Sequence, residues 1–272
     1  MKLAWSRLIS FVAVDGRVLC GEPILPSPDF DLGKTTEKTK LKAKIIVGND
    51  ISDDTGATKV SDEIVTVKKL LGPLTAADVD ILRCVGLNYG THTGRVPPPF
   101  PFIFFKPTTC IHDHNRAVEI PKIAQDDQAD YEGGLVLVIG KDAKNVPLEE
   151  AGRYLAVYLS GDFSKGFDTF APIGPVLVAS DLVQNPADLL LRTIVDGETR
   201  QEKHVSDLLF DCAYLVSYLS QGTTLRKGSV IMTGTPGGVG AGLNPLRYLV
   251  PGTVMEVQID RIRNLWNGVY FL

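Results

Sequence analysis

The stretch DYEGGLVLVIG, residues 130–140, joins a polar start to a continuous apolar run, which predicts a buried strand over 134–140. In an extended chain, residues i and i+2 point to the same face. Carboxylates at positions 132 and 134 would therefore offer two oxygen ligands on one face, which suits Mg²⁺ or Mn²⁺. Position 134 is a glycine, so the sequence keeps Glu132 alone at this point.

The elements predicted around this strand are mostly short strands. Asp15-Gly16 between two apolar runs predicts a hairpin over 6–22. Helices are predicted over 149–159, where Leu155 and Leu159 are spaced four apart, and over 205–219. A helical turn is expected over 74–80, and further strands at 44–47, 63–67, 81–87, 100–105 (aromatic and buried), 176–179, 189–195, 230–233 and 254–259. The sum is a β-dominated α+β fold, with a small β-rich N-terminal domain at 1–73 and a main domain at 74–272.

Composition excludes several classes of protein. The 272 residues are 44% hydrophobic and 22% charged, enough to bury a substantial core. The net charge of −4 comes without a block of like charge, so neither a nucleic acid nor an anionic membrane is predicted as a partner. No segment has the length of a membrane span, no cleavage site follows the apolar run 8–14, and no CxxC pair occurs among the four cysteines. These features predict a cytoplasmic protein with reduced thiols.

Two predicted strand ends carry polar residues suited to catalysis. His92 lies in the loop that follows the strand 81–87, and a histidine there can act as a general base because its pKa lies near working pH. Lys106 ends the aromatic strand, where its ammonium group either reaches water or holds an anion. For His92 the alternative is an ordinary surface loop.

A glycine-rich segment, MTGTPGGVGAG at 232–242, can present backbone N–H groups to a carboxylate or an oxyanion. It matches neither a Walker loop nor a dinucleotide fingerprint. A plain turn is the alternative. His112 and His114 have a spacing that fits a metal site, but without a third ligand we expect solvated loop histidines.

Together these segments resemble the fumarylacetoacetate hydrolase family. The motifs follow the family's order over residues 82 to 259: Val85-Gly86-Leu87-Asn88-Tyr89 with His92, Phe105-Lys106-Pro107, Asp130-Tyr131-Glu132, Val138-Ile139-Gly140-Lys141, Lys165-Gly166-Phe167-Asp168-Thr169-Phe170-Ala171-Pro172-Ile173-Gly174-Pro175 and Thr233-Gly234-Thr235-Pro236 with Gly238-Val239-Gly240. The resemblance implies the family's mixed β-sandwich or roll as the catalytic domain. It also implies a homodimer that uses Mg²⁺ or Mn²⁺ to cleave C–C bonds of small acylpyruvate-like or diketo acids, or to decarboxylate, tautomerise or isomerise related acids.

The same resemblance implies roles for individual residues. His92 matches the general base, and Lys106 and Lys165 match lysines that stabilise negative charge. The substrate-binding positions match Tyr89, Gly234 and Thr235, and the metal-ligand positions match Glu132 and Asp162.

The chain also departs from the family pattern. Gly134 replaces the second metal carboxylate, the Arg and Gln that usually follow the metal Asp are absent, and no acidic residue follows His92 closely. Asp162 either stands for the third metal carboxylate or closes a shortened loop. Four alternatives stay open: a metal-assisted hydrolase, a metal-independent tautomerase, decarboxylase or cyclase of a biosynthetic pathway, a non-catalytic member, and a sequence joined incorrectly at residues 161–165.

Overall fold

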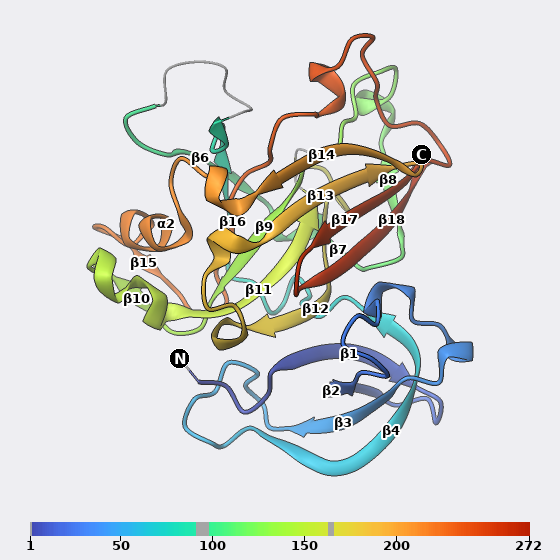
Figure 1. The fold of residues 1–272 in the computed structure, drawn as a ribbon, viewed down its shortest axis with the longest axis vertical. Coiled ribbons are helices and arrows are strands. Elements are labelled where there is room, and N and C mark those ends of the chain that lie inside the picture. Colours follow the sequence, from blue (N-terminus) through green and yellow to red (C-terminus); the bar gives the residue numbers. More distant parts are fainter. Residues whose placement is uncertain (1, 91–97, 163–165) are drawn as a thin grey trace.

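The computed structural model describes residues 2–90, 98–162 and 166–272 (Figure 1). His92 and Lys165 lie outside these residues, and for Asp162 only the backbone is described. Strands dominate the described residues, as predicted. Their bounds are β1 Arg7–Ala13, β2 Val18–Ile24, β3 Lys42–Val47, β4 Lys59–Leu71, β5 Leu82–Gly86, β6 Phe102–Lys106, β7 Ile111–His112, β8 Ala117–Ile120, β9 Gly133–Ile139, β10 Ala143–Lys144, β11 Leu155–Asp162, β12 Ala171–Ala179, β13 Leu190–Val195, β14 Glu198–His204, β15 Thr224–Leu225, β16 Val230–Met232, β17 Val254–Ile259 and β18 Arg263–Phe271.

Helical structure is sparse in the part of the chain that is described. The α-helix α2 spans Cys212–Leu219, and the Asp211 side chain caps it by accepting a hydrogen bond from the Tyr214 N–H. The remaining helical segments are short 3-10 turns, such as η1 Leu32–Lys34 and η5 Leu148–Tyr154. No helix among the described residues is long and apolar enough to cross a membrane.

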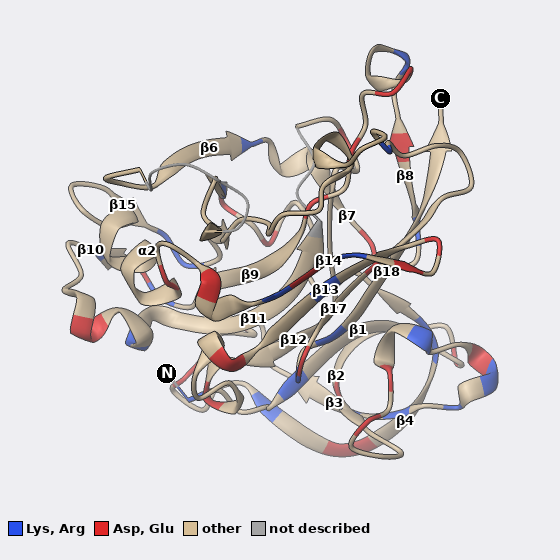
Figure 2. Ribbon diagram, turned by 45° about the horizontal axis from the view of Figure 1, so that its top comes forward, with Lys and Arg blue, Asp and Glu red and all other residues tan. Residues whose placement is uncertain are grey.

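The strands form two large sheets. One runs in the order β2-β3-β4-β1-β12-β11-β9-β16-β5-β6, with β7 beside β12, and the other in the order β14-β13-β17-β18-β8. Strands β9 and β11 of the first sheet contact β13 and β17 of the second, and the main core lies between them. Figure 2 shows that β9 and β12 carry no charged residues, whereas β4 and β14 carry charges of both signs. The apolar runs of the sequence therefore mark the centre of the fold.

The first four strands lie together below the rest of the molecule in Figure 1 and join it where β1 pairs with β12. The Asp-Gly hairpin is confirmed: β1 and β2 are antiparallel and Gly16, at the turn, has φ +90°. The division at residue 73 stays a prediction. The segment expected as a helical turn forms one turn in which the Asp78 N–H donates to the Thr75 carbonyl (3.0 Å).

Three predictions about helices and strands were wrong. The helix expected over 205–219 begins only at Cys212, after the 3-10 turn Val205–Asp207. The segment 149–159 is not a helix, because η5 ends at Tyr154 and β11 begins at Leu155. Both faces of β11 are buried, so its residues show no alternation, and the spacing of Leu155 and Leu159 imitated a helix. The aromatic strand β6 exists, but Phe102 and Phe105 are 60% and 58% exposed because β6 lies at the edge of its sheet.

Candidate active site

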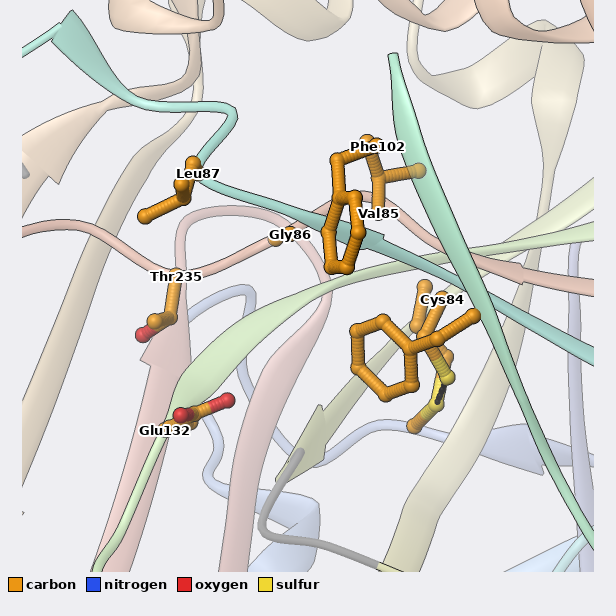
Figure 3. Close-up of a pocket in the computed structure, with 10 residues that line it drawn as sticks. Cys84, Val85, Gly86, Leu87, Phe102, Glu132 and Thr235 are labelled. Atoms are coloured by element: carbon orange, nitrogen blue, oxygen red, sulfur yellow. Dashed lines mark hydrogen bonds between the residues drawn. The ribbon is translucent and has the colours of Figure 1, made fainter. Parts of the chain in front are cut away.

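A pocket of about 340 Å³ lies where β5, β6, β9 and β16 come together (Figure 3). Its volume is at the lower end of the range typical of small-molecule sites. The described lining residues are Cys84, Val85, Gly86, Leu87, Phe102, Phe104, Glu132, Met232, Gly234 and Thr235. Figure 3 shows Glu132 and Thr235 close together on one side of the pocket, and Phe102, Val85 and Cys84 on the other.

Strand pairing explains why three distant motifs meet here. Strand β16 is antiparallel to β9, so the residues after β16 lie beside the residues before β9. This brings Gly234 and Thr235 next to Glu132. Strand β5 is parallel to β16, so its carboxyl end at Gly86 emerges at the same edge of the sheet. The predicted residues Glu132, Gly234 and Thr235 are thus brought together around one cavity.

The polar side of the pocket is held by Gln201 of β14, which is buried. Its side-chain oxygen accepts from the Gly133 N–H (3.1 Å), and its Nε2 donates to Thr235 Oγ1 (2.7 Å) and to the Pro236 carbonyl (2.8 Å). The Thr235 hydroxyl in turn donates to the Gly133 carbonyl (2.8 Å). These bonds fix the start of β9 to the glycine-rich loop, which holds the polar side rigid.

Gly234 and Asn88 form a second fixed point. Gly234 has φ +109°, and a Cβ there would lie 3.0 Å from the Val85 carbonyl oxygen and 3.1 Å from Asn88 Cβ. The buried Asn88 donates from Nδ2 to the Thr233 carbonyl (2.7 Å) and accepts from the Phe210 N–H (2.9 Å). Glycine is therefore needed at 234 both for its backbone conformation and for the close approach of the loop after β5.

Lys106 and Tyr89 are buried and are not among the described lining residues. The Lys106 Nζ donates to the Phe170 carbonyl (2.6 Å). Burial raises the pKa of Tyr89, and its hydroxyl meets no hydrogen-bond partner among the described residues. The proposed roles of Lys106 and Tyr89 remain predictions, as do those of His92 and Lys165.

The described residues contribute one carboxylate, Glu132, to the predicted metal site. Gly134 lies in β9 opposite Gly161 of β11, and Asp162 pairs with Gly133 through the backbone. No group of three His, Cys, Asp or Glu residues suited to a metal occurs within residues 2–90, 98–162 and 166–272. Because Gly134 occupies one carboxylate position of the family pattern, a full three-carboxylate site of that pattern is missing here, and we derive no chemical step through a metal ion.

The prediction that His112 and His114 are solvated was wrong for His114, which is buried. The Trp266 N–H donates to its Nδ1 (3.2 Å), so Nε2 carries the proton and donates to the Gly33 carbonyl (2.9 Å). Desolvation by burial lowers the pKa of His114 and of the half-buried His112. His114 therefore joins the N-terminal segment to β18 as a neutral hydrogen-bonding group.

The four cysteines are free thiols, as predicted, and Cys84, Cys110 and Cys212 are buried. Cys84 lines the pocket, with its Sγ 3.5 Å from Met232 Sδ. Sequence reasoning missed both Gln201 and the Cys84–Met232 pair. Gln201 lies in the polar run ETRQEK, where nothing in the sequence distinguishes it from its neighbours. Alternation does not indicate it either, because Thr199 and Lys203, two residues away on either side, are not buried.

The fold and the pocket define a β-dominated protein with a small, partly apolar site at the edge where strand ends converge. The chain matches the family "Fumarylacetoacetate (FAA) hydrolase C-terminal" over residues 82–162 and 159–270. It belongs to this family. The two matched stretches meet at residues 159–162, the junction at which the sequence lacks part of the family pattern.

Relatives and solved structures agree with this assignment. The caffeoylpyruvate hydrolase of Neonothopanus nambi is 36% identical over 270 residues, covering 91% of this chain and 87% of that protein. The oxaloacetate tautomerase YisK of Bacillus subtilis (strain 168) is 34% identical, covering 74% and 73%. The structure of 5-carboxymethyl-2-hydroxymuconate delta-isomerase from Mycobacterium smegmatis superposes with a TM-score of 0.76 at 29% identity, covering 98% and 100%.

Proposed function

We propose that the chain is an enzyme that hydrolyses a C–C bond in a small acylpyruvate-like or diketo acid. The observation that carries this proposal is the meeting of Glu132, Gly234 and Thr235, from two separate motifs of the family, around one cavity of about 340 Å³. The 36% identity to a caffeoylpyruvate hydrolase over most of both chains supports an acylpyruvate as the class of substrate.

The proposed reaction adds water to the carbonyl carbon of the acyl group. His92 takes a proton from the water, the bond between that carbon and the neighbouring CH₂ breaks, and the electron pair leaves as the enolate of pyruvate. The enolate carbon then takes up the proton held by His92, so that a carboxylic acid and pyruvate are the products. The amides of the Gly234-Thr235 turn, held by Gln201, hold the 2-oxo acid end of the substrate, and Lys106 and Lys165 stabilise the developing negative charge.

The second candidate is a tautomerase or a decarboxylase that forms an enolate without a metal ion. It is favoured by the single carboxylate that the described residues contribute to the metal site. The 34% identity to an oxaloacetate tautomerase also supports it. Release of pyruvate together with a carboxylic acid separates hydrolysis from tautomerisation, which releases nothing, and from decarboxylation, which releases CO₂.

The test is a panel of acylpyruvates and oxaloacetate incubated with the purified full chain, with products identified by mass spectrometry. We expect pyruvate release, and a loss of at least about tenfold in kcat/KM for Glu132→Gln, because the substitution removes the charge of the carboxylate that lines the pocket. Glu149→Gln, on the exposed 3-10 segment η5, is the matched control and should retain full activity. Turnover of no compound in the panel would leave the non-catalytic alternative standing.

By the same family resemblance we propose a cytoplasmic homodimer, with Mg²⁺ or Mn²⁺ as the ion to test. The molar mass in solution, measured by light scattering, distinguishes a dimer of about 59 kDa from the monomer of 29.5 kDa. Titration with Mn²⁺ in a calorimeter tests for the ion. The lone described carboxylate leads us to expect weak binding.

A further inference from the structure

The pocket has one charged and one apolar half. Glu132 is the charged residue among its described lining residues, and none of these is cationic. The far side from Glu132 and Thr235 is formed by carbon and sulfur atoms (Figure 3). We propose that this apolar half holds an aryl group, so that the enzyme selects aryl-substituted acylpyruvates over dicarboxylic 2-oxo acids; this inference rests on the function proposed above.

The apolar half presents groups that favour a flat aromatic ring. Phe102 and Phe104 lie on one face of β6, with ring centroids 6.5 Å apart and planes tilted by 37°. Cys84 and Met232 meet on the neighbouring strands, with their sulfur atoms 3.5 Å apart. Aromatic rings pack well against tilted phenyl rings and against polarisable sulfur. An aliphatic chain would fill the same volume but would lose these contacts.

A second carboxylate on the substrate is disfavoured in the apolar half. It would be desolvated against walls of carbon and sulfur atoms (Figure 3), which is costly for an ionised group. Oxaloacetate has such a second carboxylate, whereas an aryl acylpyruvate has a neutral ring instead.

The backbone at the end of β5 shapes the pocket. A Cβ on Gly86 would lie 2.7 Å from Phe102 Cδ1, so the glycine makes room for the ring of Phe102. Leu87 follows with φ +55°, an unusual conformation for a bulky residue, and its side chain lines the pocket while half exposed. Strain of this kind is typical of segments whose surroundings impose a functional geometry.

The first experiment compares two acylpyruvates on the full chain: 4-phenyl-2,4-dioxobutanoate and its 4-methyl analogue. We expect kcat/KM for the phenyl compound to exceed that for the methyl compound by about tenfold or more, because the apolar half buries the ring and leaves the methyl group with little contact. Equal or better use of the methyl compound would overturn the aryl assignment and leave the proposed hydrolase intact.

Two matched variants of β6 test which side chain causes the preference for the phenyl compound. Phe104→Ala should lower the phenyl-to-methyl ratio about tenfold, because it removes one aromatic wall of the pocket. Phe105→Ala changes the adjacent residue, whose side chain stacks under Arg83 on the opposite face of β6, and should leave the ratio unchanged. An equal fall in both variants would contradict the proposal.

Binding without turnover separates this inference from the proposed function. Phenylpyruvate, which has no second carbonyl to cleave, is titrated into the protein in a calorimeter, with Phe104→Ala and Phe105→Ala alongside. Binding that Phe104→Ala alone weakens supports the aryl site even if no acylpyruvate is cleaved. Absence of binding, or equal binding of phenylpyruvate and oxaloacetate, would overturn it.

Discussion

Strands β9 and β6 both read as continuous apolar runs, yet they contribute to the pocket in opposite ways. β9 lies between β11 and β16, and all seven of its residues are buried. β6 pairs with β5 and ends its sheet, with Phe102 and Phe105 more than half exposed. The residue before β9 supplies the carboxylate of the pocket, and β6 supplies the aromatic wall.

The difference shows that two similar apolar sequences can form a rigid central strand, β9, and a more adaptable edge strand, β6. At the start of β9 the Gly133 N–H and carbonyl are bonded by Gln201 of β14 and by Thr235 of the glycine-rich loop, so the polar half cannot shift without breaking buried hydrogen bonds. An edge strand has one neighbour and lower local stability, so its rings can adjust to a ligand. Substitutions near β9 should therefore change folding most, and substitutions on β6 should change selectivity.

The largest effect on stability is expected for Gly133→Ala. A Cβ at this position would lie 2.0 Å from Thr193 Oγ1 and 3.2 Å from Val257 Cγ2, so the two sheets would have to separate. We expect a loss of about 2–3 kcal/mol in the free energy of unfolding, measured by urea denaturation. Gly152→Ala, where no atom lies within 4 Å of the new Cβ, is the control and should stay within about 0.5 kcal/mol of the parent. Equal stabilities would show that β9 is not rigidly held.

A smaller loss is expected for Gln201→Leu. The substitution leaves the buried Gly133 N–H and the Pro236 carbonyl without their partner, which costs about 1–3 kcal/mol. Because Thr235 also loses its donor, kcat/KM should fall by more than the loss of folded protein explains. Gln184→Leu, at an exposed position, provides the comparison in both assays. Unchanged activity in a destabilised Gln201→Leu protein would mean that the polar half needs no anchor.

A substitution at Gly134 should raise the affinity for a metal ion. Gly134→Glu adds a second carboxylate on the face of Glu132, so affinity for Mn²⁺ should rise about tenfold or more. Gly134→Gln has the same size without the charge and should not raise the affinity, and circular dichroism checks that both variants fold. Equal Mn²⁺ binding by the two variants would show that the start of β9 is no metal face.

The smallest effect concerns the pH dependence of stability and involves neither strand. Burial lowers the pKa of His114, so the unfolded chain binds its proton more readily than the folded chain. The contribution of the neutral His114 to stability is fully present above the unfolded pKa of about 6.5. It is lost as the pH falls through the lower pKa of the folded state. Glutamine does not titrate, so in His114→Gln the urea midpoint should change less between pH 7 and pH 5 than it does in the parent protein. An unchanged slope would mean that His112, whose pKa is lowered in the same direction, carries the dependence.

The sequence predicted the strands of this fold well where the chain is apolar and bounded by Gly or Pro, as in β5, β9, β13 and β17. It failed for β11, because a strand buried on both faces has no alternation to distinguish it from a helix. It also failed for the exposure of β6, because an apolar run does not say whether a second neighbour covers it. That property depends on sheet order, which is a long-range feature.

The sequence predicted those residues of the candidate site that belong to a recognisable motif. Glu132 was singled out where an apolar strand begins, and Gly234 and Thr235 in a glycine-rich segment. The family resemblance then implied their roles, and the structure brings the three together. Gln201 and His114 could not be found in this way, because their partners are more than thirty residues away in the chain. His92 and Lys165 lie outside the described residues and remain predictions.

A crystal structure of the protein with phenylpyruvate tests the central claim most directly. We expect the 2-oxo acid group beside Thr235 and Gly234, and the phenyl ring between Phe104 and the sulfur atoms of Cys84 and Met232. Ligand density elsewhere in the molecule, or a ring turned toward Glu132 with its carboxylate against Phe104, would contradict it.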